Sequence, residues 1–370
     1  MAEEPKYQQV IDWVKENIAN GQLRAGDRLM SEMELSEKFS LSRQTIRHAT
    51  GELEKEHLVT RVKGSGTYIG SGKAAPAAAR RRHMRIAVLS TFYESYIFPP
   101  TMKGIERVLS KRGYSMQVSF TDNRIPREQQ ILRDLLEKDN IDGLIVEPAK
   151  SALPNPNISY YRELQSRGIP LLFFNTSYEE IDAPCVRLDD ERVAGKAADL
   201  LLQAGHRKIA GIFKSDDGQG QLRYKGYLES LLAAGVTPGE KQVIWIDTFD
   251  YRDLASIEDV IFSRLEGSTA VLCYNDEVAY QLIDLALKRG IRVPEDLSVV
   301  GIDDSYLSGV SKVPFTSFPH PKDMLGRKAA ENLIAMIEHP EYDGGYLFDS
   351  DPVVRESVSV ITEEGERRHA

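Results

Sequence analysis

The stretch "LSEKFSLSRQTIRHATGEL", residues 35–53, places Arg, Gln and Thr among apolar residues that recur at helical spacing. Ile46, Ala49 and Leu53 fall on one face of such a helix, following the i, i+3, i+7 pattern. Gln44 and Arg47 fall on the other face, where a helix that enters a DNA groove carries its hydrogen-bonding groups. A solvated helix with incidental charges fits equally well, so this stretch alone leaves both interpretations open.

The residues on the N-terminal side predict further helices. A first helix is expected from Tyr7 to Asn20, with Gly21 as its stop. Two more helices follow, each preceded by a serine that can cap its first turn: 32–39 after Ser31 and 43–56 after Ser42.

A hairpin is predicted directly after the third helix. "HLVTRVKGSGTYIG", residues 57–70, suggests strands at 58–62 and 67–69 around a turn that contains two glycines and a lysine. Glycine turns are common in ordinary hairpins, but a helix-turn-helix followed at once by a hairpin is a winged helix. This α+β arrangement makes double-stranded DNA the favoured partner of residues 1–70.

Charge and composition set bounds on the rest of the chain. Residues 1–83 hold 14 of the 47 Lys+Arg and 11 of the 56 Asp+Glu, a balance of +3, so the remainder carries -12 and with it all of the acidic excess behind the net charge of -9. The two cysteines lack metal-site spacing, and a length of 370 residues predicts two or three compact units. Without a membrane-length apolar run or a secretory start, we expect a cytoplasmic protein that does not associate with membranes.

The segment 71–83, "SGKAAPAAARRRH", has no apolar periodicity and is expected to be a linker. Its arginines, Arg80 to Arg82, could touch DNA phosphates, although solvation is favoured. The linker separates the winged helix from a large unit at 84–362.

That large unit alternates short apolar runs with amphipathic helical stretches. The predicted strands are "MRIAVLST", "YSMQVSF", "DGLIVE", "IPLLFFN", "HRKIAGIF", "QVIWID", "STAVLCYN" and "DLSVVGI", with a further short strand in "FTSFPHP". Strands that alternate with helices predict parallel sheets covered on both faces, and two such sets predict two α/β lobes. A ligand would bind between the lobes, at the carboxyl ends of the strands.

Polar and aromatic side chains follow most of these predicted strands. They are Tyr96, Phe98, Glu147, Asn175, Lys214, Asp216, Asp217, Gln219, Arg223, Asn275, Asp276, Asp303, Asp304 and His320. Carboxylates, amides and a forked guanidinium suit vicinal hydroxyls, and aromatic faces suit the C–H side of a sugar. Helix capping is the alternative for single residues, notably Asp217, Asp276 and Asp304.

The first part of the chain resembles the DNA-binding domain of GntR-type regulators over its full length. The motifs are "GQLRAGDRL", "SEMEL", "LSRQTIR" and "GSGTY", with Met30 where the family usually has Pro. The resemblance implies that DNA contacts come from the third helix, from the wing and from two flanking positions. These residues are Ser42, Arg43, Gln44, Thr45 and Arg47, then Lys63, Gly64 and Gly66, and finally Lys6 and Glu32.

Residues 84–360 resemble the effector-binding domain of LacI/GalR-type repressors, which is related in fold to periplasmic sugar-binding proteins. Landmarks are "NIDGLIVEP", "AGHRKIAGI" and "FTSFPHPKDMLGRKAAENLI". The resemblance implies ligand contacts at Asn175, Arg223, Asn275, Asp303 and His320. It places Tyr96, Phe98, Glu147, Lys214 and Gln219 on pocket loops.

The pairing of these two parts resembles the arabinose-responsive repressors of Gram-positive bacteria, as do "STFYESYIFPPTMKGIE" and "GIFKSDDGQG". This resemblance implies a homodimer that binds a palindromic operator and is released by L-arabinose, with no cofactor beyond that effector. Three alternatives are a different neutral or phosphorylated sugar, a transport-type sugar-binding protein, and an enzyme of the GntR–aminotransferase type. The last two are disfavoured because the chain has no signal segment, is short for such an enzyme and lacks a lysine in a recognisable cofactor motif.

Overall fold

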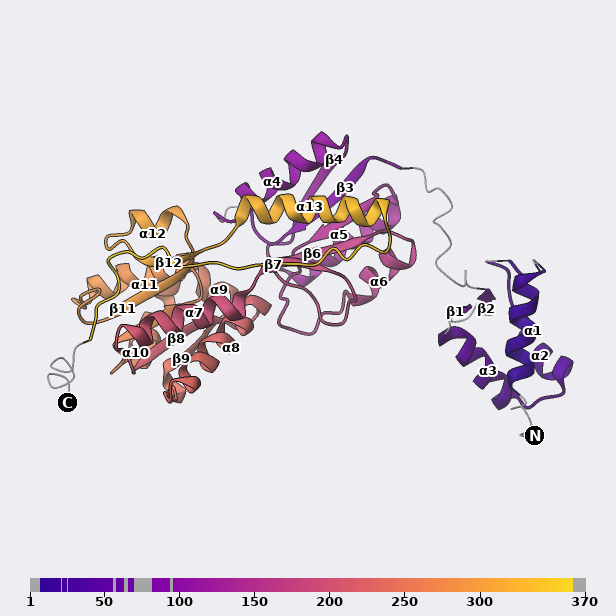
Figure 1. Cartoon of the computed structure of the whole chain (residues 1–370), viewed down its shortest axis with the longest axis horizontal. Helices are drawn as coiled ribbons and strands as arrows, with labels where there is room; N and C mark the ends of the chain where they lie inside the picture. The colour runs from indigo at the N-terminus through magenta and orange to yellow at the C-terminus, as the bar shows by residue number, and fades with distance from the viewer. Residues whose placement is uncertain are drawn as a thin grey trace. The chain divides into compact units, whose positions relative to one another are not determined.

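The computed structural model describes residues 7–20, 22–24, 26–55, 58–62, 66–69, 82–93 and 96–361. It divides into two compact units, Met1–Arg81 and Arg82–Ala370 (Figure 1), here called the head and the body. Lys6, Lys63 and Gly64, together with the expected linker as far as Arg81, lie outside the described residues. In the part of the chain that is described, no helix combines the length and apolar content needed to cross a bilayer.

The head is a winged helix, as predicted. Its elements are α1 (Gln8–Ala19), α2 (Glu32–Phe39), α3 (Arg43–Lys55), β1 (Val59–Val62) and β2 (Gly66–Ile69). The two strands are antiparallel, with Val59 opposite Ile69. The predicted apolar face of α3 is buried, since Ile46, Ala49 and Leu53 are each 0% exposed.

Local hydrogen bonds fix where the head's helices begin. Ser31 caps α2 through a capping box, in which its hydroxyl accepts from the Glu34 amide and the Glu34 carboxylate accepts from the Ser31 amide. The Ser42 hydroxyl accepts from the amide of Thr45 at 3.2 Å. Both predicted caps are therefore confirmed, and both satisfy amides that a helix start leaves without a partner.

The body has two lobes, each built on a parallel sheet. The first lobe holds β3 (Arg85–Ser90), α4 (Phe98–Lys111), β4 (Ser115–Phe120), α5 (Ile125–Lys138), β5 (Gly143–Val146), α6 (Ile158–Ser166), β6 (Leu171–Phe174), β7 (Cys185–Leu188), α13 (Lys322–Glu338) and β13 (Tyr346–Phe348). Its strand order is β13-β7-β6-β5-β3-β4. Separate apolar clusters pack on the two faces of this sheet.

The second lobe contains the remaining elements. They are α7 (Asp190–Gln203), β8 (Ile209–Lys214), α8 (Gly218–Ala233), η1 (Glu240–Gln242), β9 (Val243–Ile246), α9 (Thr248–Arg252), η2 (Leu254–Ile257), α10 (Glu258–Leu265), β10 (Ala270–Cys273), α11 (Asp276–Lys288), β11 (Ser298–Asp303), α12 (Tyr306–Val310) and β12 (Thr316–Pro319). The strand order is β12-β11-β10-β8-β9. This confirms the predicted two-lobed α/β body with parallel sheets.

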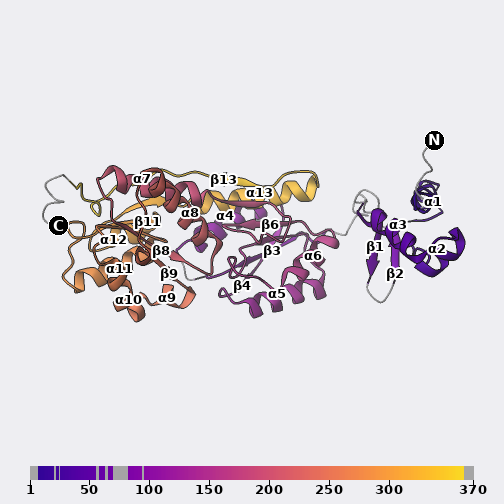
Figure 2. The same ribbon diagram turned by 90° about the horizontal axis from the view of Figure 1, so that it is seen from below.

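The chain passes between the lobes more than once. It leaves the first lobe after β7 and returns through α13, which lies beside α4 in both ribbon views (Figures 1 and 2). After β13 it re-enters the second lobe, where Val353 bridges to Ser317. The crossings place the carboxyl ends of strands from both sheets around one cleft.

Helices α7 and α8 approach each other closely at two glycines. A Cβ on Gly226 would lie 1.8 Å from the carbonyl oxygen of Glu191, whereas a Cβ on Gly195 would meet nothing nearer than 3.5 Å. We expect Gly226→Ala to lower the free energy of unfolding by roughly 1–3 kcal/mol, because the helices must move apart. Gly195→Ala is the matched control, and urea unfolding of both variants makes the comparison. Equal stabilities for the two variants would contradict the close crossing.

Candidate functional site

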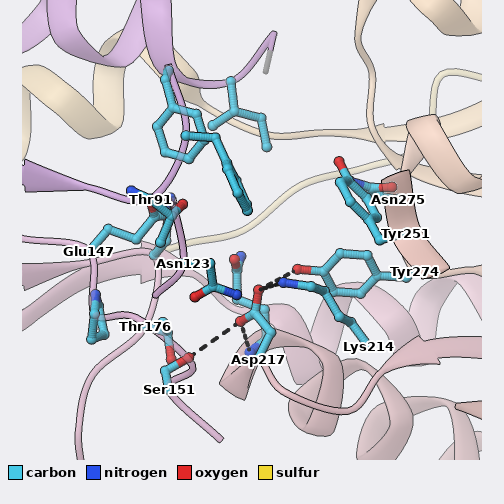
Figure 3. A pocket seen from close by; sticks show the side chains of 16 residues that line it. Thr91, Asn123, Glu147, Ser151, Thr176, Lys214, Asp217, Tyr251, Tyr274 and Asn275 are labelled. Atoms are coloured by element: carbon cyan, nitrogen blue, oxygen red, sulfur yellow. Dashed lines mark hydrogen bonds and ion pairs between the residues drawn. The ribbon is translucent and has the colours of Figure 1, made fainter. Parts of the chain in front are cut away.

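A cavity of about 50 Å³, called here the inner cavity, lies in the cleft between the two lobes of the body. Both lobes line it: Figure 3 shows Thr91 and Glu147 of the first lobe facing Tyr251 and Asn275 of the second. The predicted site residues on its wall are Phe98, Glu147, Asn175, Lys214, Gln219 and Asn275. The cavity thus lies at the strand ends where the sequence predicted it.

Of the other four predicted effector residues, Arg223, Asp303 and His320 are buried next to this wall, and Tyr96 is half-buried. The Tyr96 hydroxyl donates to Oδ2 of Asp303 at 2.6 Å, and Nε2 of His320 lies 3.2 Å from Oδ1 of Asn175. Arg223 Nη2 is 3.6 Å from Oδ1 of Asp303. These contacts join all four residues to the set that lines the cavity or to one another.

Glu147 is a buried acceptor at the end of β5. Its carboxylate accepts from the Thr91 amide at 2.9 Å, from the Thr91 hydroxyl at 2.6 Å and from the Asn175 amide group at 2.7 Å. Burial raises the pKa of Glu147, and the bonds from Thr91 and Asn175 oppose that rise. Glu147 therefore fixes the orientation of two neighbours in the wall of the cavity.

Arg223 forms the centre of a buried charge cluster. Its Nε lies 2.8 Å from Oδ1 of Asp190, and both side chains are almost completely buried. Burial raises the pKa of Asp190 to about 6, and the Arg223 charge opposes this. The pKa of Asp303 is also raised by burial, while that of His320 is lowered well below its usual value, first by burial and then by Lys322 and Arg223. His320 is thus neutral near physiological pH.

Several buried polar atoms of the cleft have no hydrogen-bond partner within the described residues. They include Oδ1 of Asp303 and Nδ1 of His320. Asn175 and Asp303 also have positive φ values of 63° and 120°, an uncommon backbone conformation for residues other than glycine. Unsatisfied buried groups are costly, so these atoms are suited to hydrogen bonds with a bound polar ligand.

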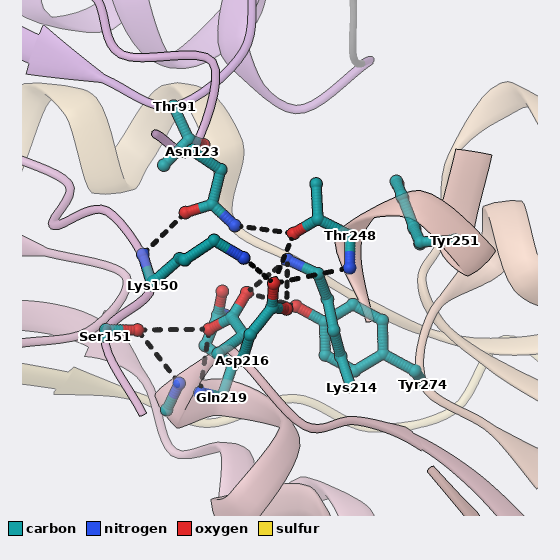
Figure 4. A network of polar contacts seen from close by, with 12 residues as sticks. Thr91, Asn123, Lys150, Ser151, Lys214, Asp216, Gln219, Thr248, Tyr251 and Tyr274 are labelled. Atoms are coloured by element: carbon teal, nitrogen blue, oxygen red, sulfur yellow. Dashed lines mark hydrogen bonds and ion pairs between the residues drawn. The ribbon is translucent and has the colours of Figure 1, made fainter. Parts of the chain in front are cut away.

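The lobes also touch each other directly beside the cavity. Lys150 of the first lobe pairs with Asp216 of the second at 2.6 Å, and Asn123 donates to the Thr248 hydroxyl at 2.7 Å (Figure 4). The Gly218 amide donates to the Ser151 hydroxyl at 2.9 Å. These bonds hold the lobes together independently of any ligand.

Sequence reasoning missed part of the wall. Thr91, Asn123, Ser151, Thr176, Tyr251 and Tyr274 line the cavity without having been singled out. Thr91 and Tyr274 directly follow β3 and β10, so the strand-end rule could have found them. Asn123 and Tyr251 lie in a turn and on the short α9, where no sequence pattern marks them.

The capping alternative holds for one of the three aspartates. Asp217 caps α8 and accepts from the Gln219 amide. Asp276 is not a cap: Asn275 caps α11 by accepting from Val278, while Asp276 accepts from Ser305 and Ser317. Asp304 pairs with Arg355 at 2.7 Å instead of capping a helix.

The head presents its predicted DNA-contacting side chains at the start of α3. Arg43, Gln44, Arg47 and the cap residue Ser42 are exposed, while Thr45 is half-buried. Glu32 pairs with Arg47, with Nε and Oε2 2.8 Å apart. Gly66 has a φ of 129°, and a Cβ there would lie 2.9 Å from Nε of Arg28, so the wing strand starts where glycine is required. An exposed arginine and glutamine at a helix N-terminus are suited to base edges in a major groove.

Comparison with known proteins matches both units. Residues 6–69 match the family described as bacterial regulatory proteins, gntR family, and residues 198–358 match the periplasmic binding protein-like domain. The chain is 35% identical over 362 residues to the arabinose metabolism transcriptional repressor of Geobacillus stearothermophilus, covering 96% of this chain and 98% of that protein. It is 36% identical over 367 residues to the protein of the same name from Halalkalibacterium halodurans, covering 96% and 97%.

A solved structure shares the fold of the body. The transcription regulator CcpA of Lactococcus lactis superimposes with a TM-score of 0.67 at 23% identity, covering 74% of this chain and 99% of that one. At this identity the likeness supports the fold alone.

Proposed function

Because this chain belongs to the family of arabinose metabolism transcriptional repressors, and so is a sugar-responsive transcriptional repressor and not an enzyme, we propose that it is a homodimer released from operator DNA by L-arabinose. Two heads bind the halves of a palindromic operator, and the bodies form the dimer. L-arabinose binds in the inner cavity, and no other cofactor takes part. The protein acts in the cytoplasm, where its operator lies.

The observation that carries this proposal is the set of unsatisfied hydrogen-bonding atoms between the lobes. Oδ1 of Asp303 can accept from a sugar hydroxyl, and Nδ1 of His320 lies in the same buried cluster. A sugar that satisfies groups from both lobes favours the closed arrangement of the cleft. Vicinal hydroxyls, which donate and accept at fixed spacing, match such a set.

The charges favour a neutral sugar over a phosphorylated one. Lys214, the cation in the wall of the inner cavity, lies 3.4 Å from Asp216 and 3.5 Å from Asp217. Glu147 and Asp303 add further carboxylates nearby. A phosphate would meet a cation that is already neutralised and several anions that repel it.

Sugar can release DNA only if it binds the DNA-free arrangement of the protein better than the DNA-bound one. A 100-fold weakening of DNA binding needs about 2.7 kcal/mol of such differential affinity. Closure of the lobes around the sugar changes the geometry of the dimer and thereby the spacing of the heads.

The test is fluorescence anisotropy of the full chain on a labelled promoter fragment from its own locus. We expect L-arabinose to release the DNA, and D-galactose, D-xylose, L-ribulose and their phosphates to be much weaker.

Arg43→Ala should weaken DNA binding by about 10- to 100-fold without changing sugar affinity, because it removes one base-reading side chain. Release by another sugar would overturn the effector assignment, and failure to bind the fragment at all would overturn the role of the head.

A further inference from the structure

A second cavity, called here the outer cavity, lies in the body and has a volume of about 920 Å³. Both lobes line it, and it shares Phe92, Asn123 and Tyr251 with the wall of the inner cavity. The shared residues make the two cavities neighbours within one cleft. A ligand seated in the inner cavity could therefore extend into the outer one.

The wall of the outer cavity is rich in exposed aromatic rings. Phe249 is 76% exposed and Tyr306 is 68% exposed, while Tyr280 is 38% exposed. Large aromatic side chains gathered at one opening commonly mark a binding surface. A flat ring with an apolar face and a polar edge suits the C–H face of a sugar, whose hydroxyls remain in water.

Several charged groups of this wall make contacts within the protein. Lys150 pairs with Asp216, and the Arg252 guanidinium stacks over the Phe92 ring at 5.0 Å from its centre. Glu277 accepts from the Tyr251 hydroxyl. These contacts engage Lys150, Arg252 and Glu277 within the protein, while Arg124 adds a further cation to the wall.

The two cavities differ in volume. One buried water needs a cavity volume of roughly 10–15 Å³. The inner cavity, at about 50 Å³, therefore has room for one sugar ring at most. The outer cavity has ample room for another ring. Any longer sugar bound in this cleft must place its second ring there.

We propose that the outer cavity is a second sugar subsite, so that the protein also binds a disaccharide made of its effector sugar. One ring occupies the inner cavity, and the other stacks on the exposed rings of Phe249 and Tyr306. This inference rests on the proposed function, because the first ring uses the same inner site as the monosaccharide. It extends the effector class from free pentose to short pentose oligosaccharides.

The test is isothermal titration calorimetry of the full chain with L-arabinose and with α-(1→5)-linked L-arabinobiose. We expect the disaccharide to bind and to compete with the monosaccharide. The double variant Phe249→Ala/Tyr306→Ala should weaken disaccharide binding by about 10-fold, since two aromatic contacts are lost, and leave arabinose binding within about twofold. Val310→Ala is the matched control, because Val310 is also exposed and lies on α12 with Tyr306 but does not line the outer cavity.

The outcomes separate this inference from the proposed function. If arabinose binds and the disaccharide does not, or if the double variant weakens both sugars equally, the second subsite is wrong and the proposed function stands. If the disaccharide binds and arabinose does not, the subsite stands and the monosaccharide effector is wrong. If neither sugar binds, both proposals fail.

Discussion

Replacing Arg223 with Met should lower the free energy of unfolding of the body by about 3–5 kcal/mol, because two buried carboxylates lose their shared cation. Arg223 lies 2.8 Å from Asp190 and 3.6 Å from Asp303, and both aspartates are 0% exposed. Its Nη1 also donates to the carbonyl of Tyr274. Methionine fills much of the volume but satisfies none of these groups.

The measurement is urea unfolding followed by tryptophan fluorescence. The chain has two tryptophans, Trp13 in the head and Trp245 in the body. In a Trp13→Phe background, Trp245 therefore reports the body alone. This separation matters because a chain with two units need not unfold in one step.

The control for Arg223 is a neighbouring exposed ion pair. Lys225 on the same helix lies 2.9 Å from Glu191, and Lys225→Met should change the free energy of unfolding far less than Arg223→Met, because solvent screens this exposed pair. The loss in free energy of unfolding caused by Arg223→Met should also become smaller as the pH falls. The pKa of Asp190 is already raised to about 6, and without Arg223 it rises further, so protonation at low pH removes the buried charge. A deficit below about 1 kcal/mol, or one that does not depend on pH, would contradict the buried cluster.

The head could be predicted closely because its determinants are local. Ser31 with Glu34, and Ser42 with Thr45, are separated by three residues, and each pair fixes a helix start. The apolar face of α3 repeats within one helix, so its burial follows from periodicity alone. Helix bounds therefore agreed with the predictions to within one or two residues.

Two strands of the body escaped prediction because their signals are short and distant. β7 has four residues and β13 has three, and the two pair with each other across more than a hundred residues, with Tyr346 opposite Val186. Neither has the continuous apolar run that marked the central strands. β13 is the edge strand of its sheet and β7 lies next to it, and such short strands are set by tertiary pairing, which sequence periodicity does not contain.

Strand order explains which of the predicted site residues lie close together. Glu147 and Asn175 follow neighbouring strands of one sheet, so their proximity is a consequence of parallel topology. Asn275 and Asp276 show the limit, since both follow β10 but only the first caps α11 and lines the cavity. Asn275 was expected to face the cleft and does, but the helix cap was expected at Asp276 and lies at Asn275, because the exact start of a helix is set by local geometry that the sequence pattern does not fix.

Asp303→Asn should produce a repressor that binds DNA normally but needs about 10- to 150-fold more sugar for release, the range expected for loss of a hydrogen bond to a charged group. Oδ2 of Asp303 accepts from Tyr96, which leaves the buried Oδ1 for a ligand. Asparagine has the same shape as aspartate, so the backbone at a φ of 120° is no more strained in the variant than in the original chain. DNA affinity should be unchanged because the substitution lies in the body, while the DNA-contacting residues lie in the head.

The neighbouring residue supplies the matched control for this variant. Asp304 is partly exposed and its carboxylate is already paired with Arg355 at 2.7 Å, so Asp304→Asn should respond to sugar much as the original chain does. Anisotropy titrations with sugar and calorimetry without DNA together separate lost sugar binding from lost coupling between body and head. If Asp303→Asn releases DNA at the original sugar concentration, Oδ1 of Asp303 does not bind the effector. If it fails to bind DNA, the role of Asp303 is structural, because a residue needed only for the effector leaves the DNA-bound state intact.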